Sequence, residues 1–358
     1  MKLVQMAADT IQGKPKGSAS TIVTFFDFMR AFDKVWRDGL IWKMVDMGIP
    51  YSFVKYTRLF LSARKTKVRV NGEASDPFFL NEGLPQGSAI SPILFLIYIN
   101  DITDYINDQA TPSLFADETA AWTVVGKVKR DAERRMQAII DGVVKWAREW
   151  KMELNLDKTE AMVISSSRKD LNWKPHLTIE GHEIKIVSEY KFLGVVVDSG
   201  LRFKTHVNRI IAKCKKRNNI LRCLAGKDWG QSLESQRKLY TTYIRSAIEY
   251  ASPAWYPWIS KTSRRKLETV QNESIRIMAR LAKTCPSDFL RLEAGLEPLE
   301  DRMKKNCMIT WEKYMRLPAE DSRRKLQEKQ VKQRLKTRNG WRHHTAPLMT
   351  QFSVNRDT

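Results

Sequence analysis

The run Thr21-Ile22-Val23-Thr24-Phe25-Phe26, which ends directly before Asp27, decides the predicted fold. Every residue in this run is β-branched or aromatic, which is typical of a strand buried in a sheet. Asp27 is therefore expected at the end of a buried strand. A charged side chain at the end of a buried strand indicates a functional role, and the rest of the sequence contains other carboxylates that could share that role.

Helices and further strands are predicted on both sides of this run. The first twenty residues indicate a short helix and a loop, and residues 37–61 a helical stretch with a break at 48–50. Strands at 66–70 and 78–80 flank an Asn71-Gly72 turn, which is typical of a hairpin. The remaining predictions are a buried helix at 88–106, a second hairpin at 113–125, a helix at 127–150 and strands at 155–164 and 190–198. This order predicts an α+β sheet with helices packed on one face.

The chain changes character after residue 199. Helices are predicted at 204–225, 233–250 and 262–283, with loops at Gly226 and at 253–257. From about residue 318 the chain is rich in Lys and Arg, which predicts a frayed helix or a disordered tail. The second part of the chain is therefore expected to be mostly helical and basic.

Charge points to the class of partner. The 358 residues include 62 Lys and Arg against 40 Asp and Glu, a formal net charge of +22. Such an excess favours nucleic acid or an anionic membrane surface. The longest apolar run, residues 90–99, is too short to span a membrane and contains Pro92. The sequence therefore predicts a soluble protein that binds nucleic acid, with no membrane partner.

The N-terminus and the cysteines bear on the compartment. The first residues turn polar before the core of a signal peptide could form. Four scattered cysteines lack the spacing of a zinc site, which favours reduced thiols in an intracellular compartment. They are Cys214, Cys223, Cys285 and Cys307. We expect the nucleus or the cytoplasm, and no secretion.

Carboxylates at two distant positions could form one site. Asp27 follows the buried strand, and Asp117 and Glu118 occupy the expected turn of the second hairpin. If the sheet brings them together, the carboxylates repel one another unless a cation neutralises them. Mg²⁺ prefers such oxygen ligands, and a pair of ions can activate a primer hydroxyl and stabilise leaving pyrophosphate. The alternative is that these are solvated turn residues, because turns favour Asp.

Five stretches resemble, in the same order, the motifs of reverse transcriptases from non-LTR (LINE-type, jockey-like) retrotransposons. They are FFDFMRAFDKV at residues 25–35, GLPQGSAISP at 83–92 with its continuation to 101, FADET at 115–119, LNLDKT at 154–159 and YKFLG at 190–194. The likeness extends to about residue 303. It implies an α+β polymerase fold, with a right-hand palm followed by a mostly helical thumb.

The resemblance implies metal and catalytic roles. Asp27, Asp117 and Glu118 would bind the catalytic ions together with the Phe28 carbonyl. Asp33, six residues after Asp27, would have a supporting role and no metal. Two Mg²⁺ ions are implied, with Mn²⁺ as a possible substitute.

Further residues are implied to contact the substrates. Phe32 would be a steric gate that favours dNTP over rNTP, with plain core packing as the alternative. Gln86 and Gly87 would contact the incoming nucleotide, since glycine permits close approach and the amide offers hydrogen bonds. Leu193 and Gly194 would hold the primer end.

Basic residues complete the implied site. Lys158 would protonate the departing pyrophosphate, with an exposed lysine on a solvated face as the alternative. In the helical part, the densest basic run would follow the template–primer backbone, although such a run is more often a solvated face. It contains Lys213, Lys215, Lys216 and Arg217.

The sequence departs from the family pattern in two ways. The third motif normally reads Ala-Asp-Asp, whereas this chain has Glu118, and an error of about 1 Å in position can lower a rate about a hundredfold. The chain also begins about twenty residues before the first palm motif. We therefore expect the upstream fingers that clamp the triphosphate, and an endonuclease, to come from other element-encoded domains or chains.

The leading functional prediction is an RNA-directed DNA polymerase that extends a DNA primer with dNTPs on an RNA template. The alternative is an impaired or inactive retrotransposon-derived fragment that only binds nucleic acid. The expected organisation has four parts: 1–125 for a remnant of the fingers and the catalytic palm, 126–198 for the rest of the palm and the primer grip, 199–310 for the helical thumb and connection, and 311–358 for a flexible basic tail.

Overall fold

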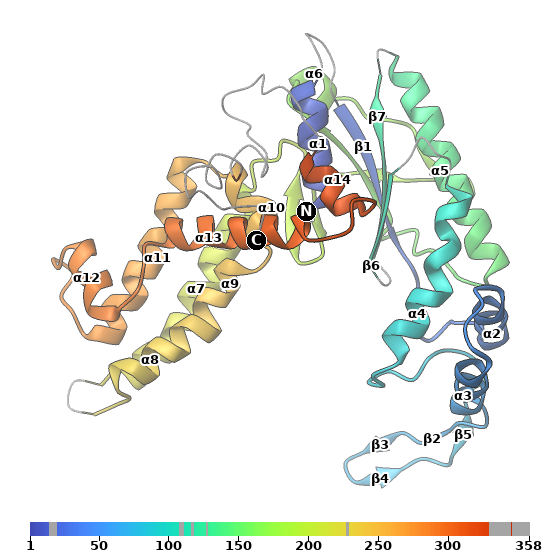
Figure 1. Cartoon of the computed structure of the whole chain (residues 1–358), viewed down its shortest axis with the longest axis horizontal. Coiled ribbons are helices and arrows are strands. Elements are labelled where there is room, and N and C mark those ends of the chain that lie inside the picture. The colour runs from blue at the N-terminus through green and yellow to red at the C-terminus, as the bar shows by residue number, and fades with distance from the viewer. Residues whose placement is uncertain are drawn as a thin grey trace. The chain divides into compact units, whose positions relative to one another are not determined.

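The computed structural model describes residues 1–13, 20–106, 111–115, 118–126, 128–226, 229–328 and 345, with the backbone alone at 12, 13 and 111–115. Two compact units divide the chain, and each is described by itself (Figure 1). The sheet unit contains Thr21–Val163 and Lys169–Ser188. The helical unit contains Met1–Ser20, Ile164–Arg168 and Glu189–Thr358.

A five-stranded sheet organises the sheet unit, in the order β11-β8-β1-β7-β6. Its strands are β1 (Ser20–Asp27), β6 (Thr111–Phe115), β7 (Glu118–Val125), β8 (Glu160–Ser165) and β11 (Lys185–Ile186). The predicted buried strand is confirmed, because β1 is central and every residue of it before Asp27 is buried. The antiparallel hairpin of β6 and β7 is also confirmed.

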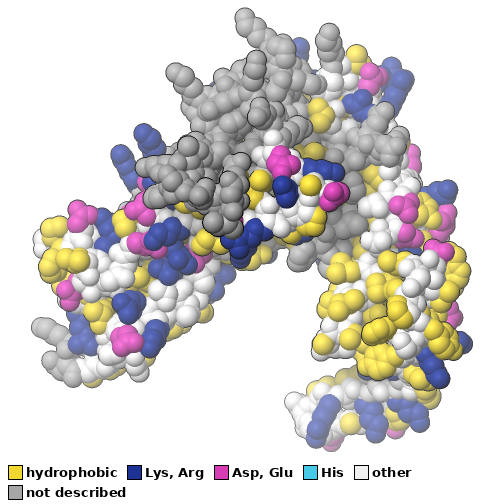
Figure 2. Space-filling view, viewed as in Figure 1, with side chains coloured by type: hydrophobic (Ala, Val, Ile, Leu, Met, Phe, Trp, Pro, Cys, Tyr) yellow, Lys and Arg dark blue, Asp and Glu magenta, His cyan; other side chains and the backbone are white. Residues whose placement is uncertain are grey.

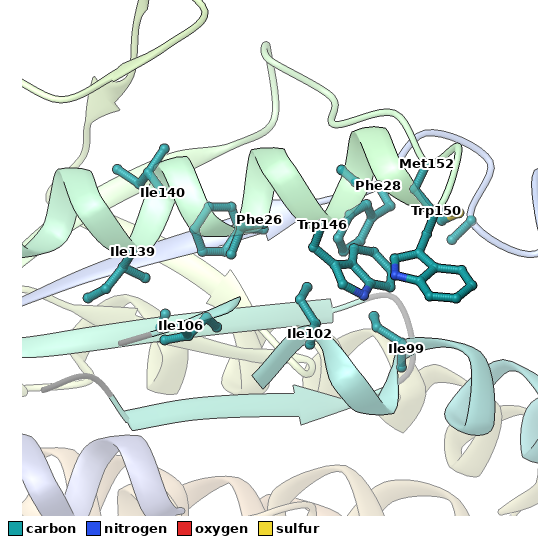
Figure 3. Close-up of a cluster of buried hydrophobic side chains, with 14 of the residues drawn as sticks. Phe26, Phe28, Ile99, Ile102, Ile106, Ile139, Ile140, Trp146, Trp150 and Met152 are labelled. Atoms are coloured by element: carbon teal, nitrogen blue, oxygen red, sulfur yellow. The ribbon is translucent and has the colours of Figure 1, made fainter. Parts of the chain in front are cut away.

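Helix α5 (Lys129–Glu149) packs against the sheet at β7. The helices between β1 and β6 are α2 (Arg37–Asp46), α3 (Tyr51–Leu61), α4 (Ser91–Ile99) and a 3₁₀ helix (Asn100–Tyr105) that packs against α5. Apolar residues of α5 recur at helical spacing and meet Phe26 of β1, and Phe28 just after it, in one buried cluster (Figure 3). The Trp146 ring lies edge-on to Phe28, with 5.7 Å between ring centroids. This packing holds the carboxyl end of β1 firmly against α5.

A long hairpin lies between α3 and α4 in the sequence. Its arms are β2 (Lys65–Thr66) paired with β5 (Phe78–Phe79), and β3 (Arg69–Val70) paired with β4 (Glu73–Ala74). Asn71 and Gly72 both have positive φ, as a two-residue hairpin turn requires. This predicted hairpin is therefore confirmed, although it has four short strands where two were expected.

The last part of the sheet unit consists of short elements. The chain passes from β8 through α6 (Arg168–Leu171) to the antiparallel pair β9 (Thr178–Ile179) and β10 (His182–Glu183). It then returns to the sheet as β11, which runs parallel to β8.

The helical unit contains a hairpin and a set of packed helices. The hairpin is β12 (Glu189–Phe192) and β13 (Val195–Asp198). The helices are α1 (Lys2–Gly13), α7 (Lys204–Leu224), α8 (Leu233–Leu239), a π-helix (Tyr240–Arg245), α9 (Ser246–Glu249), α10 (Ser252–Trp255), a 3₁₀ helix (Tyr256–Trp258), α11 (Lys261–Ala279), α12 (Ser287–Ala294), α13 (Leu299–Met315) and α14 (Ser322–Glu328). Helices α7 and α11 pack together, and the buried Ser274 hydroxyl donates to Asn218.

Three local predictions are wrong in detail. The strand expected at 190–198 is a hairpin, because Leu193 and Gly194 adopt positive φ and reverse the chain. The strand expected from 155 begins at Glu160, since residues 156–158 form a turn. The loop expected at 253–257 is helical, because a proline is compatible with the first turn of a helix.

The division into units differs from the expected parts. The β12–β13 hairpin belongs to the helical unit, because the Val196 N–H donates to His206 of α7 and the Tyr250 hydroxyl donates to Leu193. Residues 1–20 group with the same unit, where α1 contacts α10. The described part of the chain contains no helix that is both long and apolar enough to cross a membrane.

Candidate active site

Asp27 and Glu118, two of the predicted metal ligands, lie on neighbouring strands of the sheet. Asp27 is the last residue of β1, and Glu118 is the first residue of β7, which lies next to β1 in the sheet. The end of β1 and the start of β7 lie at the same end of the sheet (Figure 1). Glu118 and Phe115 form the last pair of the β6–β7 ladder, so Glu118 belongs to strand β7 and not to the turn in which it was predicted. Asp117 lies outside the described residues.

The backbone at the end of β1 is held on its other side by residues 153–155. The Asn155 N–H donates to the Asp27 carbonyl, and the Met29 N–H donates to the Glu153 carbonyl, both at 2.8 Å. Phe28 and Leu154 face each other between these bonds as an antiparallel bridge. In a pair flanked in this way, the carbonyl of the central residue points away from the neighbouring strand. The Phe28 carbonyl is therefore directed away from Leu154, as a ligand role would require.

Lys158 lies beside the Asp27 carboxylate. Its Nζ is 3.9 Å from Asp27 Oδ2, and its side chain is 71% exposed. The turn that carries it is held by the Lys158 N–H, which donates to the Asn155 side chain, and Thr159 Oγ1 accepts the Asp27 N–H. A loosely held ammonium at this distance can move between the carboxylate and a bound anion, which is compatible with the predicted role in proton transfer.

The predicted metal-ligand set is chemically consistent. A carboxylate at Asp27, a carboxylate at Glu118 and the Phe28 carbonyl are all oxygen donors, which Mg²⁺ and Mn²⁺ prefer. Within the described residues, no group of three or more His, Cys, Asp or Glu side chains could hold a metal ion. The third predicted carboxylate, Asp117, is outside that set, so the described donors fit as part of a site.

Side-chain packing and a backbone hydrogen bond fix the position of Phe32, the predicted steric gate. Its ring is stacked on Phe95 of α4, with 4.6 Å between centroids and 22° between planes. The Leu84 N–H donates to the Phe32 carbonyl at 2.7 Å. A fixed Phe32 ring is expected whether the residue is a steric gate or only part of the core. The stacking on Phe95 fixes the ring.

The GLPQG segment is tied to the chain that follows β1. The Gly83 N–H donates to the Val35 carbonyl at 2.8 Å, and a Cβ on Gly83 would lie 2.5 Å from the Asp33 carbonyl oxygen. Gln86 Nε2 donates to Asp33 Oδ1 at 2.9 Å. Gly87 has φ +83°, a conformation that favours glycine, and a Cβ placed there would meet no atom of the described residues within 4 Å.

The sequence predicted only a general supporting role for Asp33, and the structure shows that its carboxylate binds the Gln86 side chain. It holds the Gln86 amide nitrogen, so the amide oxygen is the end left for a ligand. The contact joins residues separated by 53 positions, and no local pattern could have indicated it.

The predicted primer-binding residues form a turn of the helical unit. Leu193 and Gly194 occupy the two central positions of the β12–β13 hairpin. The Tyr250 hydroxyl donates to the Leu193 carbonyl at 3.0 Å, and its ring would lie 3.1 Å from a Cβ on Gly194. Tyr250 is therefore the residue that supports this turn, and the sequence contains no signal for it.

The basic run of α7 divides into two kinds of residue. Lys213, Lys215 and Lys216 are exposed. Arg217 instead donates to the Tyr243 carbonyl, and its guanidinium lies 4.2 Å from the Tyr243 ring centroid. The three lysines are thus the members of the run that can reach a phosphate backbone without breaking a contact.

Comparison with known proteins establishes the family. The family model described as reverse transcriptase (RNA-dependent DNA polymerase) matches residues 3–197. The chain therefore belongs to the reverse transcriptase family, and the prediction made from the five motifs is confirmed. Reverse transcriptases generally use divalent metal ions and bind RNA templates.

Curated relatives agree with this assignment. The chain is 26% identical over 281 residues to "RNA-directed DNA polymerase from mobile element jockey" of Drosophila funebris, covering 77% of this chain and 30% of that protein. It is 24% identical over 288 residues to "Probable RNA-directed DNA polymerase from transposon BS" of Drosophila melanogaster, covering 79% and 31%. The chain thus spans about 30% of the length of these relatives. Similarity to known proteins therefore extends beyond the palm motifs into the helical unit.

Among solved structures, telomerase from Candida tropicalis in complex with a TWJ fragment of telomeric RNA has a TM-score of 0.43 and 11% identity. The match covers 91% of this chain and 51% of the telomerase chain. The α+β fold class predicted from the sequence is confirmed by the sheet and helices of the structure itself.

Proposed function

We propose that this chain is the catalytic module of an RNA-directed DNA polymerase, which extends a DNA primer with dNTPs on an RNA template. The observation that carries the proposal is the family match over residues 3–197 combined with Asp27 at the end of the central strand, beside β7. The names of the jockey and BS relatives support the same reaction.

Asp27, the Phe28 carbonyl, Asp117 and Glu118 would hold two Mg²⁺ ions, with Mn²⁺ as a substitute. Bound there, the ions would lower the pKa of the primer hydroxyl and stabilise charge on the phosphoryl oxygens. The chain's own contribution is to fix these donors: α5 packs beneath β1, and residues 153–155 hold the backbone on both sides of Phe28. Lys158 would protonate the leaving pyrophosphate from its place beside Asp27.

Phe32 and Gln86 would bind the sugar end of the nucleotide. The Phe32 ring, stacked on Phe95, leaves a flat apolar wall that excludes a 2′-hydroxyl. The Gln86 amide, anchored by Asp33, would present its oxygen to the sugar of the nucleotide. Gly87 would allow the nucleotide to approach the backbone closely.

The helical unit would hold the primer–template. Leu193 and Gly194, supported by Tyr250, would contact the primer end. Lys213, Lys215 and Lys216 would contact the phosphate backbone. Because the relatives are about three times longer, other domains of the same element would supply fingers and endonuclease. Relatives named as Pol polyproteins support that arrangement. We place the reaction inside the cell, in the nucleus or cytoplasm.

Primer extension on an RNA template, with Mg²⁺ or Mn²⁺, tests the proposal. The Asp27→Asn and Asp117→Ala variants are expected to lose extension by about a thousandfold, since metal-assisted charge stabilisation contributes several kcal/mol. The matched control is Asp46→Asn, which removes an exposed carboxylate at the end of α2. The control is expected to extend primers normally.

Two further variants refine the site. Glu118→Asp restores the common motif and is expected to raise extension by up to about a hundredfold, because the extra methylene displaces the carboxylate by about 1 Å. Phe32→Ala is expected to raise rNTP incorporation relative to dNTP. If no variant or metal gives extension while primer–template still binds, the chain is a nucleic-acid-binding fragment and the proposal is overturned.

A further inference from the structure

The outer face of α3 and the β2–β5 hairpin exposes an unusual set of aromatic rings. Tyr51 is 77% exposed, Phe53 62%, Tyr56 56% and Phe79 57%. Globular proteins rarely leave so many large apolar side chains together in water without a binding partner. We call α3 and the β2–β5 hairpin together the hairpin surface. Figure 2 shows its hydrophobic side chains over α3 and its basic side chains over the hairpin.

Positive charges are interleaved with these rings. Residues 51–82 contain six Lys and Arg and three Asp and Glu, a net charge of +3. Lys55, Arg58, Arg64, Lys65 and Lys67 form no ion pair with any described residue. The cations of the hairpin surface are therefore available to an external anion.

Rings and cations of this surface are in direct contact. The Lys65 ammonium lies 5.5 Å from the Phe79 ring centroid, and the Arg64 guanidinium lies 5.3 Å from that of Phe60. The Phe60 ring is stacked in turn on Tyr56, with 11° between planes. An alternation of flat rings and cations matches the alternation of bases and phosphates along a nucleic-acid strand.

A pocket of about 260 Å³ lies where the hairpin joins α3. Arg37, Arg58 and Arg64 line it together with Trp36 and Phe79. Its size suits a phosphate or one nucleotide and excludes a duplex. Since Asp38 is the only acidic residue among the described residues that line it, the pocket carries an excess of positive charge.

Arg37 makes this pocket rigid. Its guanidinium donates to the carbonyls of Leu61, Leu80, Glu82 and Gly83, at 2.5 to 2.9 Å. Burial, followed by the charge of Arg64, lowers the pKa of Arg37, while Glu82 opposes the shift. With Arg37 committed to the backbone, Arg58 and Arg64 are the donors left for a ligand.

We propose that the hairpin surface binds single-stranded nucleic acid, with bases stacked on its exposed rings and phosphates held by Arg58, Arg64, Lys65 and Lys67. Exposed rings favour unpaired bases, because a base in a duplex has both faces covered by its neighbours. An acidic protein segment would satisfy the charges but would leave the flat rings without a specific partner. The proposal does not rest on polymerisation, because the surface contains none of the predicted metal ligands.

Binding of fluorescent oligouridine and oligothymidine to the full chain, measured by anisotropy in EDTA, tests this proposal. Phe79→Leu keeps the apolar bulk but removes the ring, and is expected to weaken binding about tenfold, within the range for one stacked base. Lys65→Gln/Lys67→Gln is expected to lower the dependence of log Kd on log salt by about 1.4, since each contact with a single strand contributes about 0.7.

Matched controls separate this surface from the general positive charge of the chain. Lys169→Gln/Lys174→Gln removes two exposed lysines elsewhere in the sheet unit and is expected to leave affinity and salt dependence unchanged. Equal losses in both double variants would overturn the proposal, as would equal competition by a blunt duplex. Absence of oligonucleotide binding would overturn it as well, and would favour an acidic protein partner.

Cross-linking provides a test that needs no substitution. Ultraviolet irradiation of the wild-type chain with an oligonucleotide in EDTA is expected to attach peptides from residues 51–80. Cross-links confined to the helical unit would contradict the proposal. Asp27→Asn is expected to keep these cross-links while losing extension, so failure of this inference and failure of the proposed polymerase activity are distinguishable.

Discussion

Lys43 of the sheet unit and His206 of the helical unit are both buried basic side chains, but their surroundings differ. Lys43 Nζ donates to the Tyr98 carbonyl and to Asp101 Oδ1, both at 2.5 Å, and lies 3.4 Å from the Trp150 ring centroid. His206 Nδ1 accepts the Val196 N–H at 3.3 Å, and its buried Nε2 has no hydrogen-bond partner among the described residues.

The pKa values of the two side chains express this difference. Burial lowers the pKa of Lys43 to about 8, although Asp101 opposes the shift. Burial and the charge of Arg209 lower the pKa of His206 to about 4. At neutral pH Lys43 is therefore charged and His206 is neutral. The comparison shows that a buried base persists either as an ion with a carboxylate and an aromatic ring, or as a neutral ring.

Removing the counter-charge of Lys43 is expected to have the largest effect. Asp101→Ala leaves a buried ammonium without its carboxylate and also removes the acceptor of Trp146 Nε1. Breaking a buried pair in this way lowers the free energy of unfolding by about 3–5 kcal/mol, measurable by urea denaturation. The double variant Lys43→Met/Asp101→Ala should recover most of the loss. Equal losses in the single and double variants would show that the charge is not the cause.

Acid is expected to destabilise the surroundings of His206. Its pKa is about 4 in the folded chain, against 6.5 for an unperturbed histidine, so the unfolded chain binds more protons as pH falls through 6.5. The contribution of His206 is complete above pH 6.5 and is lost as pH falls towards 4, by up to about 3 kcal/mol. Hydrogen exchange of β13 and α7 peptides measures the change. His206→Leu should abolish this pH dependence; an unchanged slope in the variant would exclude His206 as its source.

Alkali is expected to act on Lys43 in a different window. Because its pKa is lowered from 10.5 to about 8, the unfolded chain binds more protons between these values. Stability of the sheet unit should therefore rise by up to about 3 kcal/mol as pH increases from 8 to 10.5, with the penalty fully present below pH 8. The increase is read from the protection of α5 amides against exchange. Lys43→Met is the control, and its stability is expected to stay constant between pH 8 and 10.5. A rise that persists in this variant would show that Lys43 is not its source.

The smallest expected effect concerns an exposed contact. Tyr250→Phe removes the hydroxyl that donates to Leu193, but the ring is 57% exposed and water replaces the lost bond. We expect a loss of about 0.5 kcal/mol, at the low end for a hydrogen bond, together with faster exchange in the β12–β13 turn. Tyr243→Phe is the matched control at another exposed tyrosine, and it should leave the turn unchanged. A loss as large as that of Asp101→Ala would contradict the distinction between buried and exposed contacts.

Local patterns predicted the elements that pack through one face. β1 followed from its β-branched and aromatic run, α5 from apolar residues at helical spacing, and the hairpin at 65–79 from its Asn71-Gly72 turn. The errors fall where backbone conformation overrides composition. The run at 190–198 is rich in aromatic and β-branched residues, yet positive φ at Leu193 and Gly194 divides it into two strands.

In the candidate site too, local motifs predicted individual residues but not their contacts with residues distant in the sequence. The motifs identified the family and the predicted roles of Asp27, Gln86 and Lys158, because those residue types occur at recognisable local spacings. Their partners were not predictable. Asp33 holds Gln86 from 53 positions away, and the Lys158 ammonium, in a turn, lies beside Asp27 at the end of β1.

The sequence alone determined the order of helices and strands, the family and the charge that favours a polyanionic partner. The tertiary structure decided that Lys43 is paired with Asp101, that Arg217 is held by Tyr243, and that the rings of α3 remain exposed. The physical reason is the separation along the chain between the residues that interact. Propensity, periodicity and turn chemistry act between neighbours in the chain, whereas burial, ion pairing and ring contacts depend on which distant segments the fold brings together.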